Sequence, residues 1–287
     1  MTQTAAQPPL VDPARLAAAR ARARLDRAGF LHDEARIELQ ERLGDVNRRF
    51  TAPAIVTAFA EEWAGFLPGA TIVPMADVLD LVPGAHDLVI HAMGLHWADD
   101  PVGQIVQCRR ALRPDGLFMA VAFGGDTLTE LRTAIAQAEA EVMGGLSPRV
   151  APMAEIRAMG GLLARAGLAL PVADRLPKTV TYADAFRLMA DLRDMGETNA
   201  LADRYRAPVP RELFVRMAQI YAKEFPAKDD PNRVRATYEL VFMAAWAPHD
   251  SQQKPLRPGS AKARLAEALS TTEFDDTATP VLYRTED

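Results

Sequence analysis

The chain has 287 residues, of which 49% are hydrophobic, so it can bury a sizeable core in one large domain or two small ones. Its formal net charge is -5, and no basic stripe with interleaved aromatic residues is present, which argues against a nucleic-acid partner. The single cysteine, Cys108, excludes an internal disulfide and any cysteine-ligated metal site within one chain. No apolar run reaches the roughly 20 residues that a transmembrane helix needs, so no transmembrane segment is expected.

The first residues resemble a targeting sequence only in part. Residues 1–10 are polar and contain a proline pair near their end, and we expect a disordered tail there. Arginines among alanines over residues 15–24 mimic a mitochondrial presequence, but Asp12 and Asp26 interrupt that pattern. Arginine also outnumbers lysine along the whole chain, so the arginines in residues 15–24 are not evidence for a presequence. We therefore expect an ordinary soluble helix in a cytoplasmic, bacterial protein.

Two helices are predicted to follow the tail. The first spans residues 13–28, with proline at a tolerated position in its first turn. The second spans residues 33–43, begins at a capping Asp33 and ends at Gly44. Residues 11–50 are therefore assigned to a pair of N-terminal helices.

The next interval is too short for the fold that follows it. Residues 53–59 predict a first strand, and a short helix around Trp63 and a strand over residues 70–73 come after it. From Ile55 to Asp87 there are 87 − 55 = 32 residues, whereas one βαβ unit takes about 30. A full doubly wound domain needs three crossovers in this interval, and there is room for one or two. We infer that a βα unit is missing or collapsed.

The downstream half predicts a complete α/β arrangement. Residues 87–93 and 117–123 are apolar runs that suit strands covered on both faces. A helix over residues 100–112 and a turn at residues 113–116 lie between them, because the Pro-Asp-Gly sequence favours a turn. We assign residues 51–182 to an α/β core with a curtailed first half.

The remaining elements extend this core. Thr127 and Glu130 have the spacing of a capping box, so a helix is expected to begin there. Further segments are predicted as a helix over 153–166, a strand over 168–182, helices over 184–195 and 210–225, and a strand over 235–246. Residues 183–232 are thus a helical insert, interpreted as a lid, and residues 233–287 hold the last strand and a C-terminal tail.

Open α/β sheets bind ligands outside the carboxyl ends of their strands, so residues that follow strands are the first site candidates. His91, Met93, His96 and Trp97 follow the strand over 87–93. They either form the wall of a ligand pocket or pack at a strand-to-helix corner. A histidine–carboxylate metal site at His96 is the weakest of the interpretations, because the second histidine lies at a strand end.

Other candidates follow the remaining strands. Gly124 and Gly125 allow close approach of a ligand or simply make a turn, and Asp126 offers an acceptor or a base. Asp77 either accepts from a ligand amine or lies solvated in a loop. Gln252 belongs to an amide-rich run over residues 246–255, which suits partner contact or a tail packed on the core.

Several motifs resemble a known family. The segments at 87–90 (DLVI), 95–97 (LHW) and 109–117 (RRALRPDGL) are similar to the second half of class I S-adenosylmethionine-dependent methyltransferases. More specific segments resemble the methyltransferase-like assembly factors of respiratory complex I. These are residues 124–131 (GGDTLTEL), 147–152 (SPRVAP), 191–196 (DLRDMG), 199–201 (NAL), 251–255 (SQQKP) and 258–261 (PGSA). The malonyl carrier-protein methyltransferases are a more distant likeness.

The resemblance implies a fold, a cofactor and a client. It implies a Rossmann-like α/β sheet, S-adenosylmethionine as cofactor, and a complex I iron–sulfur subunit that is held, or modified at an arginine. It implies a pocket wall around residues 91–97 and Asp126, and we predict His96 and Asp126 as the catalytic residues. The cofactor wall would comprise Asp77, His91, Met93 and Trp97, and the partner or substrate contacts would be Gly124, Gly125 and Gln252.

The chain departs from the family pattern at the first strand. The family's glycine-rich loop has no counterpart in residues 56–63, and the first glycine, Gly65, comes too late to make the turn. Glu61 and Glu62 would also repel the carboxylate of the cofactor. Two functions from different classes follow: an enzyme that modifies a protein side chain, and a pseudo-enzyme that holds a partner.

Overall fold

The computed structural model describes residues 9–253 and 271–272, and the chain divides into two units, Met1–His249 and Asp250–Asp287. Residues 1–8 of the tail predicted over residues 1–10, and the motif at 258–261, lie outside the described residues. In the described part of the second unit, residues 250–253 and 271–272, there is no helix or strand. The elements of the first unit are α1 (Pro13–Arg20), α2 (Leu25–Ala28), α3 (Phe30–Asp45), β1 (Pro53–Thr57), α4 (Ala60–Trp63), β2 (Thr71–Pro74), β3 (His86–Ala92), the 3-10 helix η1 (Leu95–Trp97), α5 (Pro101–Ala111), β4 (Leu112–Phe123), α6 (Thr129–Met143), α7 (Ile156–Arg165), β5 (Ala169–Tyr182), α8 (Ala185–Asp194), α9 (Arg211–Glu224) and β6 (Val234–Trp246).

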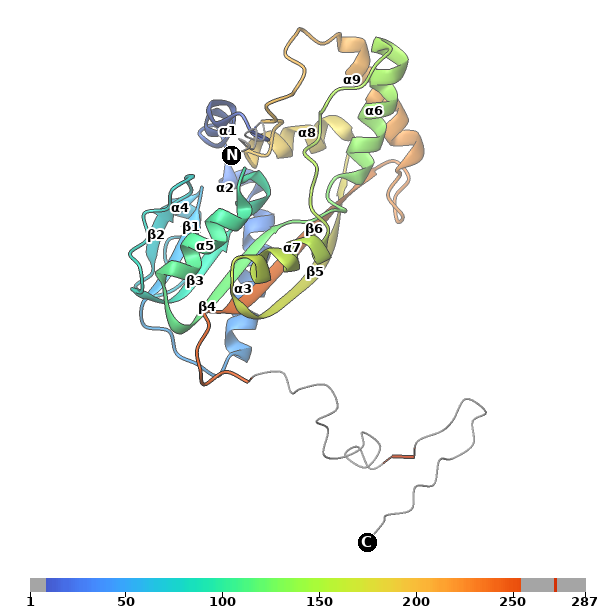
Figure 1. Ribbon diagram of the computed structural model, residues 1–287. Helices are drawn as coiled ribbons and strands as arrows, with labels where there is room; N and C mark the ends of the chain where they lie inside the picture. The colour runs from blue at the N-terminus through green and yellow to red at the C-terminus, as the bar shows by residue number, and fades with distance from the viewer. Residues whose placement is uncertain (1–8, 254–270, 273–287) are drawn as a thin grey trace. The chain divides into compact units, whose positions relative to one another are not determined.

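The first unit is built on one mixed sheet of six strands in the order β2-β1-β3-β4-β6-β5 (Figure 1). The first four strands in this order, β2, β1, β3 and β4, run parallel to one another, whereas β6 is antiparallel to both β4 and β5. This arrangement confirms the predicted methyltransferase-like α/β sheet. It also confirms the helical insert before the last strand, because α8 and α9 lie between β5 and β6 in the chain.

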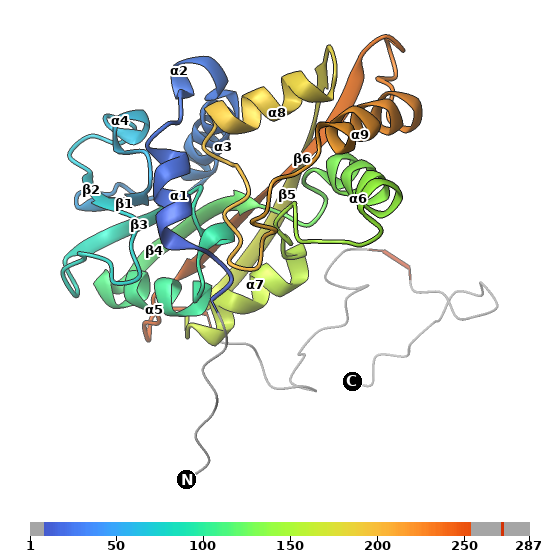
Figure 2. The same ribbon diagram turned by 90° about the horizontal axis from the view of Figure 1, so that it is seen from above.

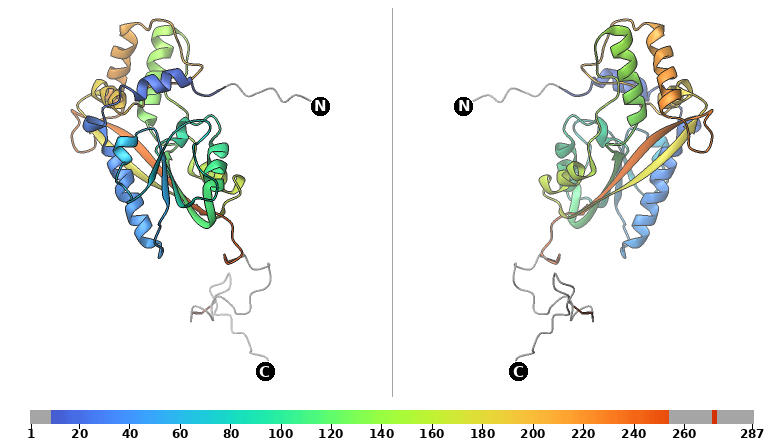
Figure 3. Two further views of the ribbon diagram at one scale, coloured as in Figure 1. Left: turned by 90° about the vertical axis from the view of Figure 1, so that its left-hand side faces the viewer. Right: turned by 90° about the vertical axis from the view of Figure 1, so that its right-hand side faces the viewer.

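Both faces of the central strands are buried, as their apolar runs predicted. Leu88 and Ile90 of β3 join one apolar cluster with α3, α6, α8 and α9, and Val89 between them joins a second cluster with α5 and α7. Figure 3 shows the sheet from the side, with α3 on one face and α5 and α7 on the other. Cys108 is a fully buried member of the second cluster.

The first half of the sheet is curtailed, as the short interval indicated. The four-residue helix α4 connects β1 to β2, and no helix lies between β2 and β3. A doubly wound sheet in the order 3-2-1-4 carries two strands beyond the first. Here only β2 lies beyond β1, so one strand and its helix are absent from this position.

The predicted N-terminal helices differ from the observed ones. The expected helix over 13–28 is broken, and α1 and α2 are separated because the amide of Arg24 donates to the carbonyl of Asp194, 2.6 Å away. The following helix begins at Phe30 rather than at Asp33, so Asp33 lies in its first turn and Gly44 lies inside it. The break between α1 and α2 therefore depends on Asp194, a residue far away in the sequence. Helix α3 begins without a side-chain cap.

Two local signals in the second half also proved wrong. The expected turn at residues 113–116 is an irregularity within β4, where the pairing with β3 shifts register and Asp115 has a φ of 61°. Thr127 and Glu130 do not form a capping box. Instead, Thr127 Oγ1 accepts from the amide of Glu239 at 3.0 Å, and Glu130 accepts from the amide of Thr237, so both side chains tie α6 to β6.

The insert is formed by α8 and α9. The helix predicted over residues 184–195 is α8, and Asp184 caps it by accepting from the amide of Arg187 at 2.9 Å. Both helices contribute buried apolar residues to the cluster that also contains α6, and Figure 2 shows α8, α9 and α6 at the same end of the sheet as α1. None of the helices in the described part of the chain combines the length and apolar character that a bilayer crossing demands.

Candidate functional site

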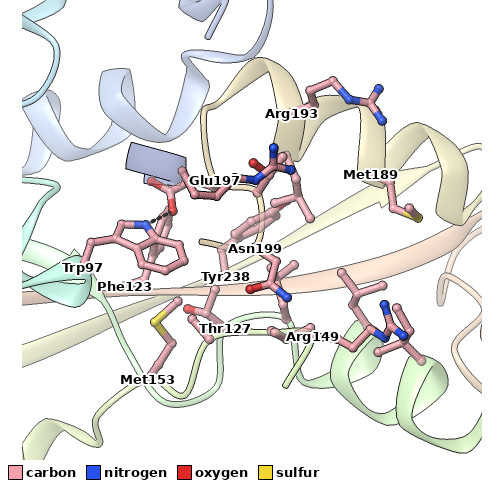
Figure 4. Close-up of a pocket in the computed structure, with 18 of the residues that line it drawn as sticks. Trp97, Phe123, Thr127, Arg149, Met153, Met189, Arg193, Glu197, Asn199 and Tyr238 are labelled. Atoms are coloured by element: carbon pink, nitrogen blue, oxygen red, sulfur yellow. Dashed lines mark hydrogen bonds between the residues drawn. The ribbon is translucent and has the colours of Figure 1, made fainter. Parts of the chain in front are cut away.

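A cavity of about 300 Å³ lies beneath the helical insert (Figure 4). Its wall combines the ends of β4 and η1, the start of α6, the loop over residues 149–153, α8, and the loop over residues 197–199 that follows α8. Phe214 of α9 and Tyr238 of β6 complete it. The cavity is therefore assembled by the carboxyl end of the sheet on one side and by the insert on the other.

Aromatic side chains form a large part of this wall. Trp97 and Tyr238 are buried, and Phe123 lies with its ring centroid 6.2 Å from that of Tyr238. Tyr238 is held in place because its hydroxyl is 3.1 Å from that of Tyr182, and burial raises the pKa of Tyr182 to about 12. Packing and the hydrogen bond between the two tyrosines therefore fix the ring of Tyr238.

The carboxylate of Glu197 lies at the cavity wall, and sequence reasoning missed it. It accepts from Trp97 Nε1 at 2.6 Å, and its Oε2 is 3.3 Å from His96 Nε2. Burial alone would raise the pKa of Glu197, but the attraction of His96, the hydrogen bonds from His96 and Trp97, and the attraction of Arg20 lower it. Glu197 is therefore a largely buried anion, with its side chain 10% exposed, whose signal in the sequence was its place between the motifs at 191–196 and 199–201.

Three arginines surround the cavity. Arg149 is neutralised by Glu139, since its Nε and a terminal nitrogen lie 3.0 and 2.6 Å from Glu139 Oε1. Arg15 and Arg193 line the rim, are exposed, and form no ion pair with another described residue. The rim is therefore cationic, whereas the interior wall carries the anionic Glu197.

Of the predicted residues after β3, Trp97 lines the cavity, whereas His91, Met93 and His96 do not. The side chain of His96 is 1% exposed and packs against Phe123. His91 is fully buried, with its Nε2 2.7 Å from Gln104 Oε1, and burial lowers its pKa to about 4. Met93 is buried with a φ of 51°.

The predicted residues after the other strands lie apart from the cavity. The side chain of Asp126 is 63% exposed and pairs with Arg175 at 3.2 Å. Gly124 packs against Glu239, and Asp77 lies in an exposed loop. Asp99 and Asp100 are occupied structurally: Asp99 Oδ1 accepts from the amides of Leu10 and Val11, and Asp100 caps α5. Gln252 belongs to the second unit.

The crevice outside the ends of β1, β2 and β3 does not fit S-adenosylmethionine. A Cβ placed on Gly94 would overlap Met75 Sδ, so the space above this glycine holds a side chain of the protein itself. The loop after β1 carries no glycine to bring backbone amides close to a ligand. Glu62, in α4 after β1, is paired with Arg36 at 3.0 Å, so its negative charge is partly neutralised.

Comparison with known proteins places these features in a family. No family model matches the chain. The arginine-hydroxylase NDUFAF5 of Danio rerio is 32% identical over 222 residues, which are 77% of this chain and 68% of that protein. The NDUFAF5 of Dictyostelium discoideum is 40% identical over 188 residues, covering 66% of this chain and 43% of that protein.

Two further comparisons are more distant. A malonyl-[acyl-carrier protein] O-methyltransferase of Xylella fastidiosa is 34% identical over 181 residues, covering 63% of this chain and 58% of that protein. The solved structure of YcgJ from Bacillus subtilis has a TM-score of 0.48 at 9% identity, covering 75% of this chain and 99% of that one. The chain spans 43% of the Dictyostelium relative and 57% of the human one, so it matches only part of their length. From its similarity to the Danio rerio protein and from its α/β sheet, the chain belongs to the NDUFAF5 family of methyltransferase-like proteins.

Proposed function

We propose that this protein is an assembly factor that holds a protein client, and that the client is an iron–sulfur subunit of respiratory complex I. The proposal draws on the relatives that carry the name arginine-hydroxylase NDUFAF5. It rests above all on one observation: the largely buried anion of Glu197 at the wall of an aromatic cavity. That cavity receives an arginine side chain of the client.

The chemistry of the cavity suits a guanidinium group. An ionised carboxylate forms strong, charge-assisted hydrogen bonds with arginine, and the flat guanidinium stacks on aromatic faces such as those of Trp97 and Tyr238. The lowered pKa keeps Glu197 charged at neutral pH. The cavity of about 300 Å³ is at the small end of ligand sites, which suits one long side chain.

The rim charges set a further requirement on the client. Arg15 and Arg193 would repel a purely cationic segment, whereas acidic residues beside the inserted arginine would pair with them. The bound segment is therefore one in which an arginine is flanked by aspartate or glutamate. This pattern makes the proposal specific enough to test with short peptides.

Replacing Glu197 by glutamine should weaken the binding of such a peptide by about 10- to 100-fold. The loss of a charge-assisted hydrogen bond costs about 1.5–3 kcal/mol, and every 1.4 kcal/mol is about tenfold in affinity. The probes are fluorescent peptides that tile the iron–sulfur subunits of complex I. Their affinities for the wild-type and Glu197→Gln chains are measured by fluorescence anisotropy.

Two controls separate the charge effect from general damage. Glu141→Gln removes a partly exposed carboxylate that does not line the cavity, and it should leave binding unchanged. A peptide with citrulline in place of arginine keeps the shape but loses the charge, and it should bind the wild-type chain as weakly as the parent binds Glu197→Gln. Equal binding of the arginine and citrulline peptides would contradict the proposal.

We propose holding of the client rather than methylation, because the crevice expected to bind the cofactor is filled by Met75. The catalytic assignment of His96 and Asp126 stays a prediction, as does a cytoplasmic, bacterial setting. The alternative, an enzyme that uses S-adenosylmethionine to modify its client, is favoured by the methyltransferase relative from Xylella fastidiosa. Loss of a client modification in both His96→Ala and Asp126→Ala would support that alternative.

A further inference from the structure

We infer that helix α1 is a permanent internal occupant of the crevice outside the carboxyl ends of β1, β2 and β3. Folds of this kind take their ligand at that crevice, next to the point where the strand order reverses. In this chain the order reverses between β1 and β3. Arg20 at the end of α1 and Met75 after β2 fill the place, and Figure 2 shows α1 lying across this end of the sheet.

The contact between Arg20 and Met75 is direct. Both terminal nitrogens of Arg20 lie 3.7 Å from Met75 Sδ, which is a weak hydrogen-bond acceptor. The Nε of Arg20 is buried and has no hydrogen-bond partner among the described residues. Burial lowers the pKa of Arg20, and the attraction of Glu197 opposes that shift. The protein thus places a cation of its own against a thioether of its own in this crevice.

Glycines beside the contact show how little space is left. A Cβ on Gly94, after β3, would overlap Met75 Sδ and would lie 3.1 Å from His91 Cε1. A Cβ on Gly196 would lie 3.3 Å from Phe59 Cζ, after β1, and 3.4 Å from the Cα of Arg20. The residues that follow all three strands therefore pack against one another or against α1.

The chain that leads into α1 is tied to the core. The amides of Leu10 and Val11 donate to Asp99 Oδ1 at 2.8 and 3.0 Å, and Asp99 lies in the loop after β3. The amide of Asp12 donates to the carbonyl of Ala200 at 2.8 Å, and its carboxylate pairs with Arg204 at 2.9 Å. The start of the helix is therefore anchored to both the sheet and the insert.

The chain that leaves α1 is anchored as well. The amide of Arg24 donates to the carbonyl of Asp194 at the end of α8, 2.6 Å away. To move as a lid, α1 would have to break these hydrogen bonds at both of its ends, whereas mobile lids are segments with few such contacts to the core. The occupied crevice is therefore part of the folded core, and α1 replaces a bound cofactor as its filling.

The first test is a titration of the full wild-type chain with S-adenosylmethionine, and separately with S-adenosylhomocysteine, by isothermal titration calorimetry. We expect no saturable heat, which corresponds to a Kd weaker than about 1 mM. A micromolar Kd for either compound would overturn the inference. Hydrogen exchange on the same protein should show the amides of α1 protected as well as those of α3, and fast exchange confined to α1 would mark it as an opening lid.

The second test compares two arginines from the same part of the chain. Arg20→Ala should lower the Tm by about 5 °C, because it empties a packed position. Arg22→Ala, at an exposed position two residues later, should shift it by less than about 1 °C. Equal shifts for the two variants would contradict a filling role for Arg20. The filled crevice also underlies the choice of client holding over methylation, but the two proposals are tested apart, because Arg20 does not line the cavity to which the arginine peptides would bind.

Discussion

Lowering the pH from about 6.5 to about 4 should remove roughly 3 kcal/mol of folding stability for each of two buried histidines. His32 and His91 each have a pKa lowered from 6.5 to about 4, chiefly because burial disfavours the charged imidazole. As the pH falls, the unfolded chain takes up protons first. Above pH 6.5 both histidines are neutral in the folded and the unfolded chain, so they do not reduce the free energy of unfolding. As the pH falls toward 4, only the unfolded chain gains these protons, and the free energy of unfolding falls.

The hydrogen bonds of these histidines explain why they are held neutral. His32 Nδ1 accepts from Trp63 Nε1 at 3.2 Å, so this nitrogen must carry no proton. His91 Nε2 donates to Gln104 Oε1 at 2.7 Å, and Gln104 in turn donates to the carbonyl of Ala76. Protonating either ring would bury a charge that faces no carboxylate partner within hydrogen-bond distance among the described residues.

Urea unfolding at pH 7, 6 and 5 measures this effect, with the lowest pH kept above the range in which the carboxylates titrate. His91→Gln and His32→Gln should each flatten the pH dependence, although both lower the stability at pH 7. A free energy of unfolding that stays constant between pH 7 and pH 5 would show that the two histidines are not held neutral.

Replacing Gly124 by alanine should destabilise the protein by about 2–3 kcal/mol. A Cβ there would overlap Glu239 Oε1 and would lie 2.5 Å from Val241 Cγ2. The side chain of Glu239 is 4% exposed and is held by Arg175 at 3.1 Å, and Val241 belongs to β6, so neither neighbour can move aside freely. The steric overlap would therefore disturb the end of the pairing between β4 and β6.

The adjacent Gly125 provides the matched control. A Cβ on Gly125 would have its nearest neighbour, Glu155 Cγ, at 3.4 Å, which is an ordinary contact. Gly125→Ala should therefore change the free energy of unfolding by less than about 0.5 kcal/mol, measured by urea unfolding alongside Gly124→Ala. Similar losses in the two variants would show that backbone flexibility, rather than packing against β6, explains the glycine pair.

Much of the sheet could be predicted because its signals are local. The apolar run of β3 and the starts of the helices predicted at residues 100 and 184 depend on neighbours in the sequence, and the structure confirms them. The break after α1 and the pairing of Thr127 with β6 depend on residues more than 100 positions away. A capping-box pattern cannot reveal that a strand competes for the same side chain.

The site shows the same division. Trp97 was a candidate because it follows a strand in a fold whose ligands bind there, and it does line the cavity. Glu197 was missed because it lies in an irregular loop after α8. Its hydrogen-bond donor, the indole nitrogen of Trp97, lies 100 residues earlier in the chain. Only the family motifs on either side of it pointed to that loop.

The loss of a strand beyond β2 changes how this protein meets its neighbours in solution. The outermost strand of a sheet has unpaired backbone groups on which another chain can build a strand, and long, flat edges therefore promote aggregation. Here that position falls to β2, which has four residues and ends in Pro74, a residue without an amide hydrogen. The shortened half of the sheet thus ends in an edge that offers little to a second molecule, and restoring a longer strand there would carry a cost in solubility.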